Sequence, residues 1–366
     1  MRIALLSPAF WPEVRRGTER FVRELGDALI AAGHRPTLIT SHRRAPSRAI
    51  EDGLEVIRNW RPPDARLRRR MFEEHLTHVP FSYLSLQRGR FDLAHAFYPT
   101  DALAAARWAR RTGKPSVLSF MGIPHRRALA NRRFRTEITI RAFAEVDATV
   151  ALSEAAALAC ERWIGVRPRV IYPGIDLETF SPGGVRAEQP TIVCAAALEV
   201  PRKRIPLLLE AFAIVRRRHS AARLVLSRPK RDDALRELDQ RWLDGIELAD
   251  LDDVTALAGA YRSAWVSALP SRDEAFGLVL AEALACGTPV VGSQEAGIGE
   301  LLDARVGRLF SGEDPAGLAD ALLECVELAR DPSTAAACRA RAEPLSRERT
   351  AERYLALYRE LIAARS

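Results

Sequence analysis

Short apolar segments alternate with longer helical stretches along almost the whole chain, and this alternation sets the fold class. Parallel strands are buried on both faces and need crossover helices, so a parallel sheet produces apolar segments separated by amphipathic ones. The first half of the chain contains the segments 2–6, 37–40, 54–57, 93–96, 116–119 and 148–151. The second half contains 191–195, 223–226, 245–248, 264–269, 290–291 and 307–309. We therefore predict an α/β protein made of doubly wound parallel sheets.

The length of the chain and one Pro/Gly-rich region predict two domains. At 366 residues the chain exceeds what one hydrophobic core usually serves, so two domains of roughly 180 residues each are expected. Residues 181–184 read Ser-Pro-Gly-Gly and a further proline stands at position 190, which is typical of a linker. We expect one Rossmann-like domain over 1–182, a second over 190–345, and an amphipathic helix over 346–366.

Two glutamates mark the most informative segment, PSRDEAFGLVLAEALACGTPVV at residues 270–291. Glu274 and Glu282 lie eight positions apart, between an apolar strand and a second strand. The pattern predicts a strand, a loop, a helix that begins near Phe276, and another strand. Glu274 then lies in the loop and Glu282 lies inside the helix, because eight residues are a little over two helical turns.

The start of this helix is expected to bind an anion. Free backbone amides at a helix N-terminus carry the positive end of the helix dipole, and Gly277 lets a ligand approach closely. A diphosphate fits there, and carboxylates beside it are good acceptors for the hydroxyls of a sugar and a ribose. The segment therefore indicates a nucleotide-sugar site. A solvated pair of glutamates on an amphipathic helix is the alternative for such a spacing taken alone.

The segment resembles the E-x7-E signature of the family-4 retaining glycosyltransferases of the GT-B fold. In that family it reads PS-x-x-E-G-F-G-x-x-x-x-E-A-x-A-C-G-x-P-V-V, and here Ala275 replaces the first glycine. Residues 170–182 resemble the family's interdomain P-x-G-x-D-x-x-x-F-x-P, so the resemblance spans nearly the whole chain. It implies two Rossmann-like domains facing a central cleft, the first on the acceptor side and the second on the nucleotide-sugar donor side. It also implies a C-terminal helix that crosses back to the first domain.

The resemblance assigns roles to individual residues. Glu282 would hold the ribose hydroxyls, Glu274 would approach the donor hexose, and Lys203 would meet the phosphate charge; we assign Glu274 and Lys203 as catalytic. The other residues expected to bind the donor lie in four places. These are the backbone amides at the helix start (Phe276, Gly277, Leu278 and Val279), the first βα loop (Gly17 and Thr18), the neighbour of Lys203 (Arg202), and the strand before the nucleotide base (Leu248).

Three positions depart from the family pattern. Thr18 replaces the second glycine of the first βα loop, and Met121 stands where many members have a histidine, with His125 four residues further on. Ala197 or Leu198 stands where the phosphate clamp usually has an arginine. Arg202 and Arg204 are the neighbouring cations available to replace it, and a surface cluster of the two with Lys203 is the alternative.

The resemblance implies transfer with retention, in which the leaving phosphate helps to deprotonate the acceptor, and no metal or other cofactor is expected. Asp250-Leu251-Asp252 spells a D-x-D motif, but we interpret it as a loop near the nucleotide base. A glycosidase is disfavoured because both glutamates lie on one loop-helix element. The departures at Thr18, Met121 and Ala197 leave a second hypothesis open, a catalytically weak or silent GT-B relative that binds a nucleotide or a glycan.

Positive charge is concentrated in the first half of the chain. Residues 1–180 hold 30 Arg and Lys against 19 Asp and Glu, and much of the excess lies in 61–70 and 126–135. These segments are candidates for contact with an anionic membrane or an anionic acceptor, and a solvated arginine face is the alternative. Nucleic acid is not expected, because no helix-turn-helix, zinc or aromatic RNA-binding pattern accompanies the charge. The acceptor itself is not identified by the sequence.

The remaining composition predicts a cytoplasmic protein, with peripheral contact at the inner face of a membrane as the open addition. No apolar run reaches the length of a membrane span, and residues 1–6 are too short for a signal peptide. Five scattered cysteines lack disulfide or metal-site spacing, so buried, reduced thiols are expected.

Overall fold

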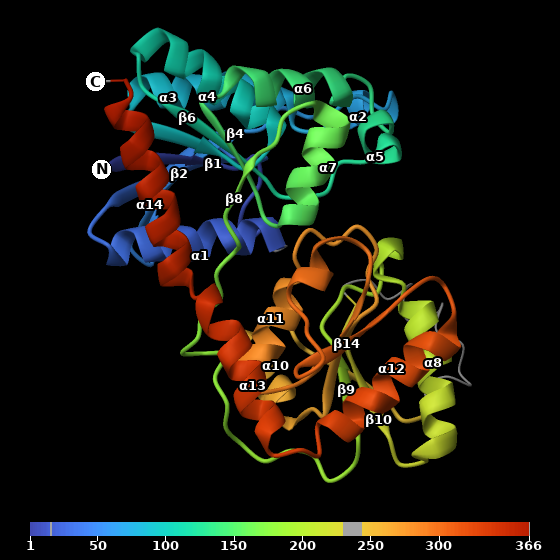
Figure 1. Ribbon diagram of the computed structural model, residues 1–366. Coiled ribbons are helices and arrows are strands. Elements are labelled where there is room, and N and C mark those ends of the chain that lie inside the picture. The colour runs from blue at the N-terminus through green and yellow to red at the C-terminus, as the bar shows by residue number, and fades with distance from the viewer. Residues whose placement is uncertain (15–16, 230–243, 366) are drawn as a thin grey trace. The chain divides into compact units, whose positions relative to one another are not determined.

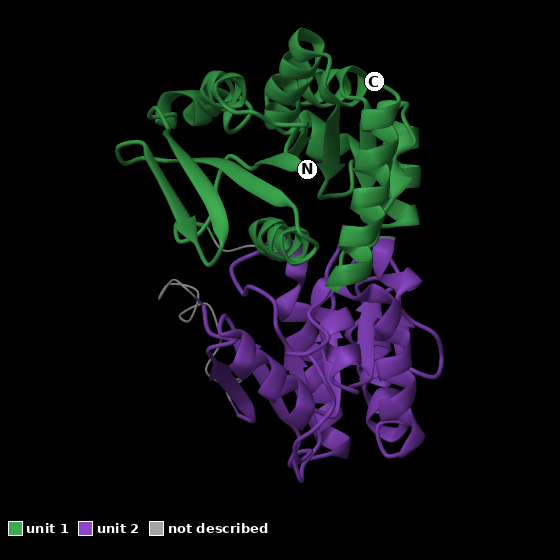
Figure 2. Cartoon of the chain, turned by 90° about the vertical axis from the view of Figure 1, so that its left-hand side faces the viewer, with its two compact units in different colours: residues 1–174, 347–366 green, residues 175–346 purple. Residues whose placement is uncertain are grey.

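The computed structural model describes residues 1–14, 17–229 and 244–365 and divides the chain into two compact units (Figure 1). Unit 1 contains residues 1–174 and 347–366, and unit 2 contains residues 175–346 (Figure 2). Each unit is built around its own sheet, as expected for doubly wound domains.

Unit 1 contains an eight-stranded sheet in the order β3-β4-β2-β1-β5-β6-β7-β8. All neighbouring strands are parallel except β3, which pairs antiparallel with β4 at the edge. The strands are β1 (Arg2–Leu6), β2 (Arg35–His42), β3 (Ser47–Glu51), β4 (Leu54–Trp60), β5 (Leu93–Ala96), β6 (Ser116–Phe120), β7 (Ala148–Ala151) and β8 (Arg169–Val170).

Helices cover both faces of this sheet. On one face α1 and α14 bury Phe21, Leu25 and Tyr354 against β1, β2 and β4, and on the other face α3 and α4 bury Leu86 and Trp108. The helices of unit 1 are α1 (Gly17–Ala31), α2 (Ala65–Arg69), η1 (Leu76–His78), α3 (Val79–Arg88), α4 (Pro99–Thr112), α5 (Arg126–Ala130), α6 (Arg135–Glu145), α7 (Glu154–Ile164) and α14 (Arg347–Ala363).

The C-terminal helix α14 is attached to this sheet by a buried chain of hydrogen bonds. The Tyr358 hydroxyl lies 2.7 Å from Nδ1 of His95, whose Nε2 lies 2.7 Å from the Ser119 hydroxyl. The Ser119 hydroxyl lies 2.8 Å from that of Tyr354. Burial lowers the pKa of His95 to about 3, so its ring is neutral and has one donor and one acceptor nitrogen.

Unit 2 contains a fully parallel six-stranded sheet in the order β11-β10-β9-β12-β13-β14. Its strands are β9 (Thr191–Cys194), β10 (Arg223–Ser227), β11 (Ile246–Ala249), β12 (Val266–Leu269), β13 (Val290–Ser293) and β14 (Gly307–Phe310). Its helices are η2 (Pro201–Lys203), α8 (Ile205–Arg218), α10 (Val254–Ser263), α11 (Leu278–Ala285), η4 (Ala296–Glu300), α12 (Pro315–Leu328), α13 (Ser333–Ala342) and η5 (Glu343–Leu345).

Every strand predicted from the sequence is present, with ends that differ by a few residues, but β3 and β8 were missed. β3 is exposed along almost its whole length, so it lacks the apolar pattern of a buried strand. The turn that precedes β4 does have a sequence signal. Asp52 and Gly53 both have positive φ, as Asp-Gly does in a two-residue hairpin turn.

All five cysteines are free and buried, as predicted. Burial raises the pKa of each thiol to about 12, which leaves them protonated and unreactive: Cys160, Cys194, Cys286, Cys325 and Cys338.

Candidate active site

The loop after β12 leads directly into α11, and Gly277 forms the junction. The helix begins at Leu278, two residues later than predicted, and Gly277 is its N-cap with φ of 92°. A Cβ atom at this glycine would lie 3.3 Å from Cγ1 of Ile298, which is fully buried in η4. Both the backbone conformation and the packing therefore require glycine here.

The start of α11 has the geometry of an anion-binding site. The first intrahelical hydrogen bonds run from the amides of Leu280 and Ala281 to the carbonyl of Gly277. The amides of Leu278 and Val279 therefore belong to the part of a helix that has no intrahelical acceptor. These amides and the helix dipole favour a negatively charged group beyond Gly277.

Glu282 lies within α11 and only 1% of its surface is exposed. The rest of α11 consists of leucine, alanine and valine, and its mean character is strongly apolar. A buried carboxylate on such a helix is unusual, because burying a charge without a strong reason is costly. The position inside the helix agrees with the prediction.

Glu274 lies in the loop, where two cations contact its carboxylate. Lys203 Nζ donates to Glu274 Oε2 at 2.6 Å, and Arg202 Nη1 donates to the same oxygen at 3.0 Å. Burial alone raises the pKa of Glu274, but the charges of Lys203 and Arg202 and their hydrogen bonds outweigh it and bring the pKa below the ordinary value. Glu274 is therefore ionised at neutral pH and fixed next to two positive charges.

Backbone hydrogen bonds position these three residues. The Arg272 amide donates to the carbonyl of Arg202 at 2.8 Å, which ties the loop to η2. The Gly297 amide donates to the carbonyl of Glu274 at 3.0 Å, which ties the loop to η4. The segment 293–300, which contains η4, thus supports the loop that carries Glu274.

Arg204 does not join this group, although the sequence made it a candidate to replace the clamp arginine. Its guanidinium is buried and donates to the carbonyls of Pro270 and Gly312 and to the hydroxyl of Ser293. These partners follow or end β12, β14 and β13, so Arg204 ties together the carboxyl ends of three strands. Arg202 is the arginine that lies beside Lys203.

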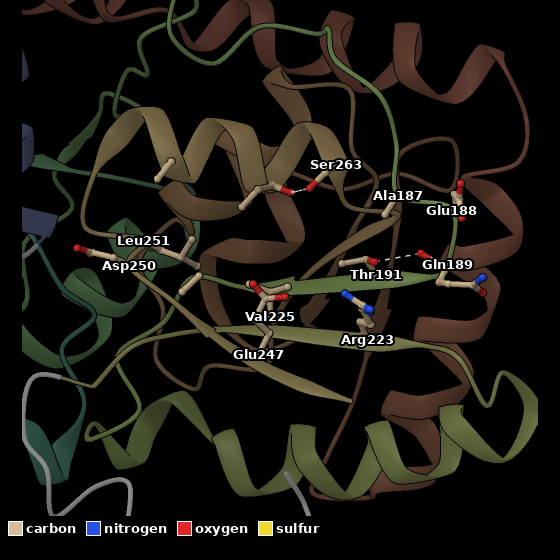
Figure 3. Close-up of a pocket in the computed structure, with 13 residues that line it drawn as sticks. Ala187, Glu188, Gln189, Thr191, Arg223, Val225, Glu247, Asp250, Leu251 and Ser263 are labelled. Atoms are coloured by element: carbon tan, nitrogen blue, oxygen red, sulfur yellow. Dashed lines mark hydrogen bonds between the residues drawn. The ribbon is translucent and has the colours of Figure 1, made fainter. Parts of the chain in front are cut away.

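A cavity of about 670 Å³ lies elsewhere in unit 2, on the face of β9, β10 and β11 next to α10 (Figure 3). Arg223, Val225 and Glu247 come from the strands, and Asp250 and Leu251 follow β11 at one end of the cavity. Leu248 lies on β11 and its carbonyl accepts a hydrogen bond from Arg228. The D-x-D segment thus borders a cavity at the carboxyl end of β11.

The predicted residues of unit 1 lie at the start of α1, not in the preceding loop. α1 begins at Gly17, which is exposed, and Thr18 is half-buried in its first turn. A Cβ atom at Gly17 would meet nothing within 4 Å, so packing does not require glycine there. Residues 15 and 16 of the same segment lie outside the described residues.

Met121, which stands where many family members have a histidine, and the nearby His125 both have structural partners. Met121 packs against the core shared by α1 and α14. His125 is the N-cap of α5 and its Nδ1 accepts from the amide of Ala128 at 3.4 Å. A helix-capping histidine was not predicted, because the residues preferred at this position are Ser, Thr, Asp and Asn.

A buried Ser-His-Asp cluster in unit 1 was also missed. The Ser82 hydroxyl lies 2.7 Å from Nε2 of His78 and donates to Oδ1 of Asp101 at 2.8 Å. All three residues have no exposed surface, so no substrate reaches the serine. The cluster joins α3 to the first turn of α4 and is structural.

Solved structures that resemble the chain are GT-B glycosyltransferases. The chain superposes on sucrose-phosphate synthase from Thermosynechococcus elongatus with a TM-score of 0.83 and 23% identity, covering 99% of both chains. It superposes on Anabaena HepE in complex with UDP and glucose with a TM-score of 0.75 and 18% identity, covering 98% and 99%. The fold is therefore GT-B, the predicted class, with two Rossmann-like units.

The sequence comparisons define the family more closely. "Glycosyl transferases group 1" matches residues 189–327 and "Glycosyltransferase Family 4" matches residues 15–179. The D-inositol 3-phosphate glycosyltransferase of Thermobifida fusca is 31% identical over 318 residues, covering 75% of this chain and 70% of that protein. The chain belongs to the family-4 glycosyltransferases.

Another relative matches over a shorter length. The D-inositol 3-phosphate glycosyltransferase of Saccharomonospora viridis is 35% identical over 225 residues, which cover 54% of this chain. The match spans about half of that relative's length, 51%.

Proposed function

We propose that the chain is a retaining glycosyltransferase that moves a hexosyl group from a nucleoside-diphosphate sugar, linked to UDP or GDP, to an acceptor hydroxyl. The observation that carries this proposal is the group formed by Glu274, in the loop that leads to the N-terminus of α11, with Lys203 and Arg202 of η2. It combines an ionised carboxylate, two cations and free helix amides. Sugar hydroxyls and a diphosphate need that combination.

Each part of the donor has a matching group. Glu282 accepts hydrogen bonds from the ribose hydroxyls, and Glu274 accepts from hydroxyls of the hexose. The amides of Phe276, Gly277, Leu278 and Val279 bind the diphosphate. The base lies near the end of β11, after Leu248.

The chemistry needs no nucleophile from the protein. The bond from the sugar C1 to the diphosphate oxygen breaks, and the acceptor oxygen forms its bond to C1 on the same face. The acceptor proton passes to the leaving phosphate oxygen. Lys203 and Arg202 stabilise the negative charge that develops on the diphosphate, which is the electrostatic contribution expected to lower the barrier most.

The reaction is proposed to be independent of metal. The acidic residues after β11 have backbone partners that explain them: Asp250 accepts from the amide of Asp252, and Asp253 is the N-cap of α10. Rates measured with and without a chelator, at equal ionic strength, test this part directly.

The acceptor is proposed to be a phosphorylated inositol. This rests on the names of the relatives from Thermobifida fusca and Saccharomonospora viridis, both D-inositol 3-phosphate glycosyltransferases. Product analysis with inositol phosphates, glycans and lipid acceptors decides between these classes.

An arginine-rich surface on unit 1 is proposed to contact anionic lipid. A bridge between Phe72 and Arg133 brings segments 61–70 and 126–135 together, although they are far apart in sequence. Met71 and Phe134 are 51% and 54% exposed on this surface. Among the described residues, the arginines of these segments without an ion pair are Arg66, Arg69, Arg70, Arg126, Arg127 and Arg133. No helix in the described part of the chain combines the length and apolar character needed to cross a bilayer.

The decisive experiment measures donor binding by calorimetry across UDP and GDP sugars, followed by transfer assays. We expect Glu282→Gln to weaken binding of the best donor by about tenfold or more, since hydrogen bonds to a charged group contribute about 1.5–3 kcal/mol each. Glu210→Gln, an exposed glutamate of α8, is the matched control. Transfer that continues unchanged in Glu282→Gln would exclude the proposed donor site.

A silent relative that only binds a nucleotide sugar is the second candidate. Met121 favours it, because its apolar side chain packs against the core where many family members have a histidine. Donor binding that is lost in Glu282→Gln, with neither transfer nor donor hydrolysis for any acceptor, is the result expected for such a protein.

A further inference from the structure

A second cavity lies in unit 1 and has a strongly basic wall. It has a volume of about 690 Å³ and lies between the β2–β4 side of the sheet and the end of α3. Six of the residues that line it are arginines, whereas Glu55 is the one carboxylate among them. Its size falls in the range of small-molecule sites, which is about 300–1,000 Å³.

Ion pairs neutralise half of these arginines. Arg48 pairs with Glu55 at 2.6 Å, Arg2 pairs with Asp92 at 3.2 Å, and Arg58 pairs with Glu51. These pairs leave no net charge.

The other three arginines of the wall are Arg35, Arg88 and Arg90. Within the described residues, none of them forms an ion pair or a side-chain hydrogen bond. Arg35 begins β2 directly beside Arg2, its register partner on β1, so two like charges lie on neighbouring strands. Arg88 ends α3 and Arg90 follows it. Three unbalanced positive charges around one cavity create a positive potential that attracts an anion.

A polar group at the wall also lacks a partner. The Ser85 hydroxyl donates to Oδ1 of Asn59 at 2.9 Å. The Nδ2 atom of Asn59 is buried and has no hydrogen-bond partner within the described part of the chain. Buried amide donors nearly always have an acceptor, so an oxygen-rich ligand here supplies what the protein does not.

We propose that this cavity binds a small molecule that carries two or more phosphate groups. Arginine is the residue best suited to this, because its planar guanidinium donates two parallel hydrogen bonds to a phosphate. Arg2 and Arg35 begin their strands, so this part of the wall lies at the amino ends of β1 and β2. Arg58 and Asn59 lie near the carboxyl end of β4, so the wall extends along the sheet. The proposed donor groups belong to unit 2, so the cavity is separate from them.

Inorganic pyrophosphate is the probe, and calorimetry is the measurement. The test uses Lys203→Gln protein as the background, because this substitution weakens pyrophosphate binding at the proposed donor site. We expect saturable binding in this background and an at least tenfold loss of affinity when Arg88→Gln and Arg90→Gln are added. Both arginines are exposed, so the variants are expected to fold, and circular dichroism checks this.

The matched control is Arg217→Gln with Arg218→Gln, two exposed arginines at the end of α8 that remove the same charge. Equal weakening in both pairs of variants would show a general charge effect and overturn the proposal. Absence of saturable binding in the Lys203→Gln background would also overturn it. A third result would also overturn the proposal: a protein that does not bind pyrophosphate but is retained on phosphatidylinositol 4-phosphate vesicles in a way that depends on Arg88 and Arg90. Since the site lies outside the proposed donor groups, these outcomes are independent of the glycosyltransferase proposal.

Discussion

At Glu274 two opposing effects act on one carboxylate. Burial disfavours its charge, and Lys203 and Arg202 favour it, so the sign of the shift shows that the cations dominate. The two cations differ in setting: the side chain of Lys203 is 15% exposed and that of Arg202 is 47% exposed. Solvent screens the second pair more than the first, so Lys203 contributes most of the stabilisation.

Lys203→Met is expected to destabilise the protein at pH 7 by about 1–3 kcal/mol, because a mostly buried carboxylate loses its nearest counter-charge. The pKa of Glu274 is lowered on folding, so the contribution of this pair is present above the ordinary value of 4.5 and disappears as the pH falls through the folded-state pKa. The difference in the free energy of unfolding between wild type and Lys203→Met should therefore be smaller in acid. Urea unfolding at pH 7 and near pH 3.5 measures this difference.

Arg202→Met is the control for this prediction. Loss of the Arg202 charge should lower the free energy of unfolding by less than about 1 kcal/mol, because the Arg202 side chain is 47% exposed and solvent screens its charge. If the difference in the free energy of unfolding between wild type and Lys203→Met stayed constant from pH 7 into acid, the effect could not be assigned to the charge of Glu274.

At the scale of elements, the attachment of α14 depends on a polar chain inside an apolar core. Tyr358, His95, Ser119 and Tyr354 are all fully buried, and each hydroxyl or ring nitrogen in the chain depends on its neighbour. Such networks are stable when every member is satisfied and costly when one is removed.

Tyr358→Phe is expected to lower the free energy of unfolding of unit 1 by about 1–3 kcal/mol, since the ring still fills its space but His95 Nδ1 loses its partner. Tyr83→Phe on α3 is the control, because its hydroxyl accepts a hydrogen bond from Gln87 in an exposed setting. Urea denaturation followed by circular dichroism compares the two. An equal, small loss in both variants would show that the buried chain adds nothing specific.

The sequence predicted the elements that have a repeating apolar pattern and missed what depends on single contacts. The β12–α11–β13 unit and the places of Glu274 and Glu282 followed from local periodicity and spacing. The sequence could not choose between Arg202 and Arg204, because the partners of Arg204, Pro270, Ser293 and Gly312, are distant in sequence and two of them are backbone carbonyls. The cavity beside Arg88 was also missed, since its wall joins strand starts and a helix end that no linear motif connects.

At the scale of the whole molecule, the uneven charge predicts a measurable preference for anionic surfaces. Arg69→Gln with Arg70→Gln should reduce binding to phosphatidylglycerol vesicles roughly thirtyfold, because each basic residue near such a surface contributes about 1 kcal/mol. Cosedimentation with phosphatidylglycerol and with phosphatidylcholine vesicles is the measurement. Arg217→Gln with Arg218→Gln is the control. Equal binding to phosphatidylglycerol and phosphatidylcholine vesicles would exclude the proposed surface.

The return of α14 to unit 1 has a consequence for the order of events during synthesis. Unit 2 is continuous in sequence, whereas unit 1 needs residues 1–174 and a helix translated after residue 346. Domains generally fold as units while the chain is being made, usually from the N-terminus onwards. Residues 1–174 of unit 1 therefore leave the ribosome first, and part of the apolar face of unit 1 stays uncovered until α14 has been translated. Ribosome-bound nascent chains stopped before α14 should therefore be the ones that chaperones recognise most strongly.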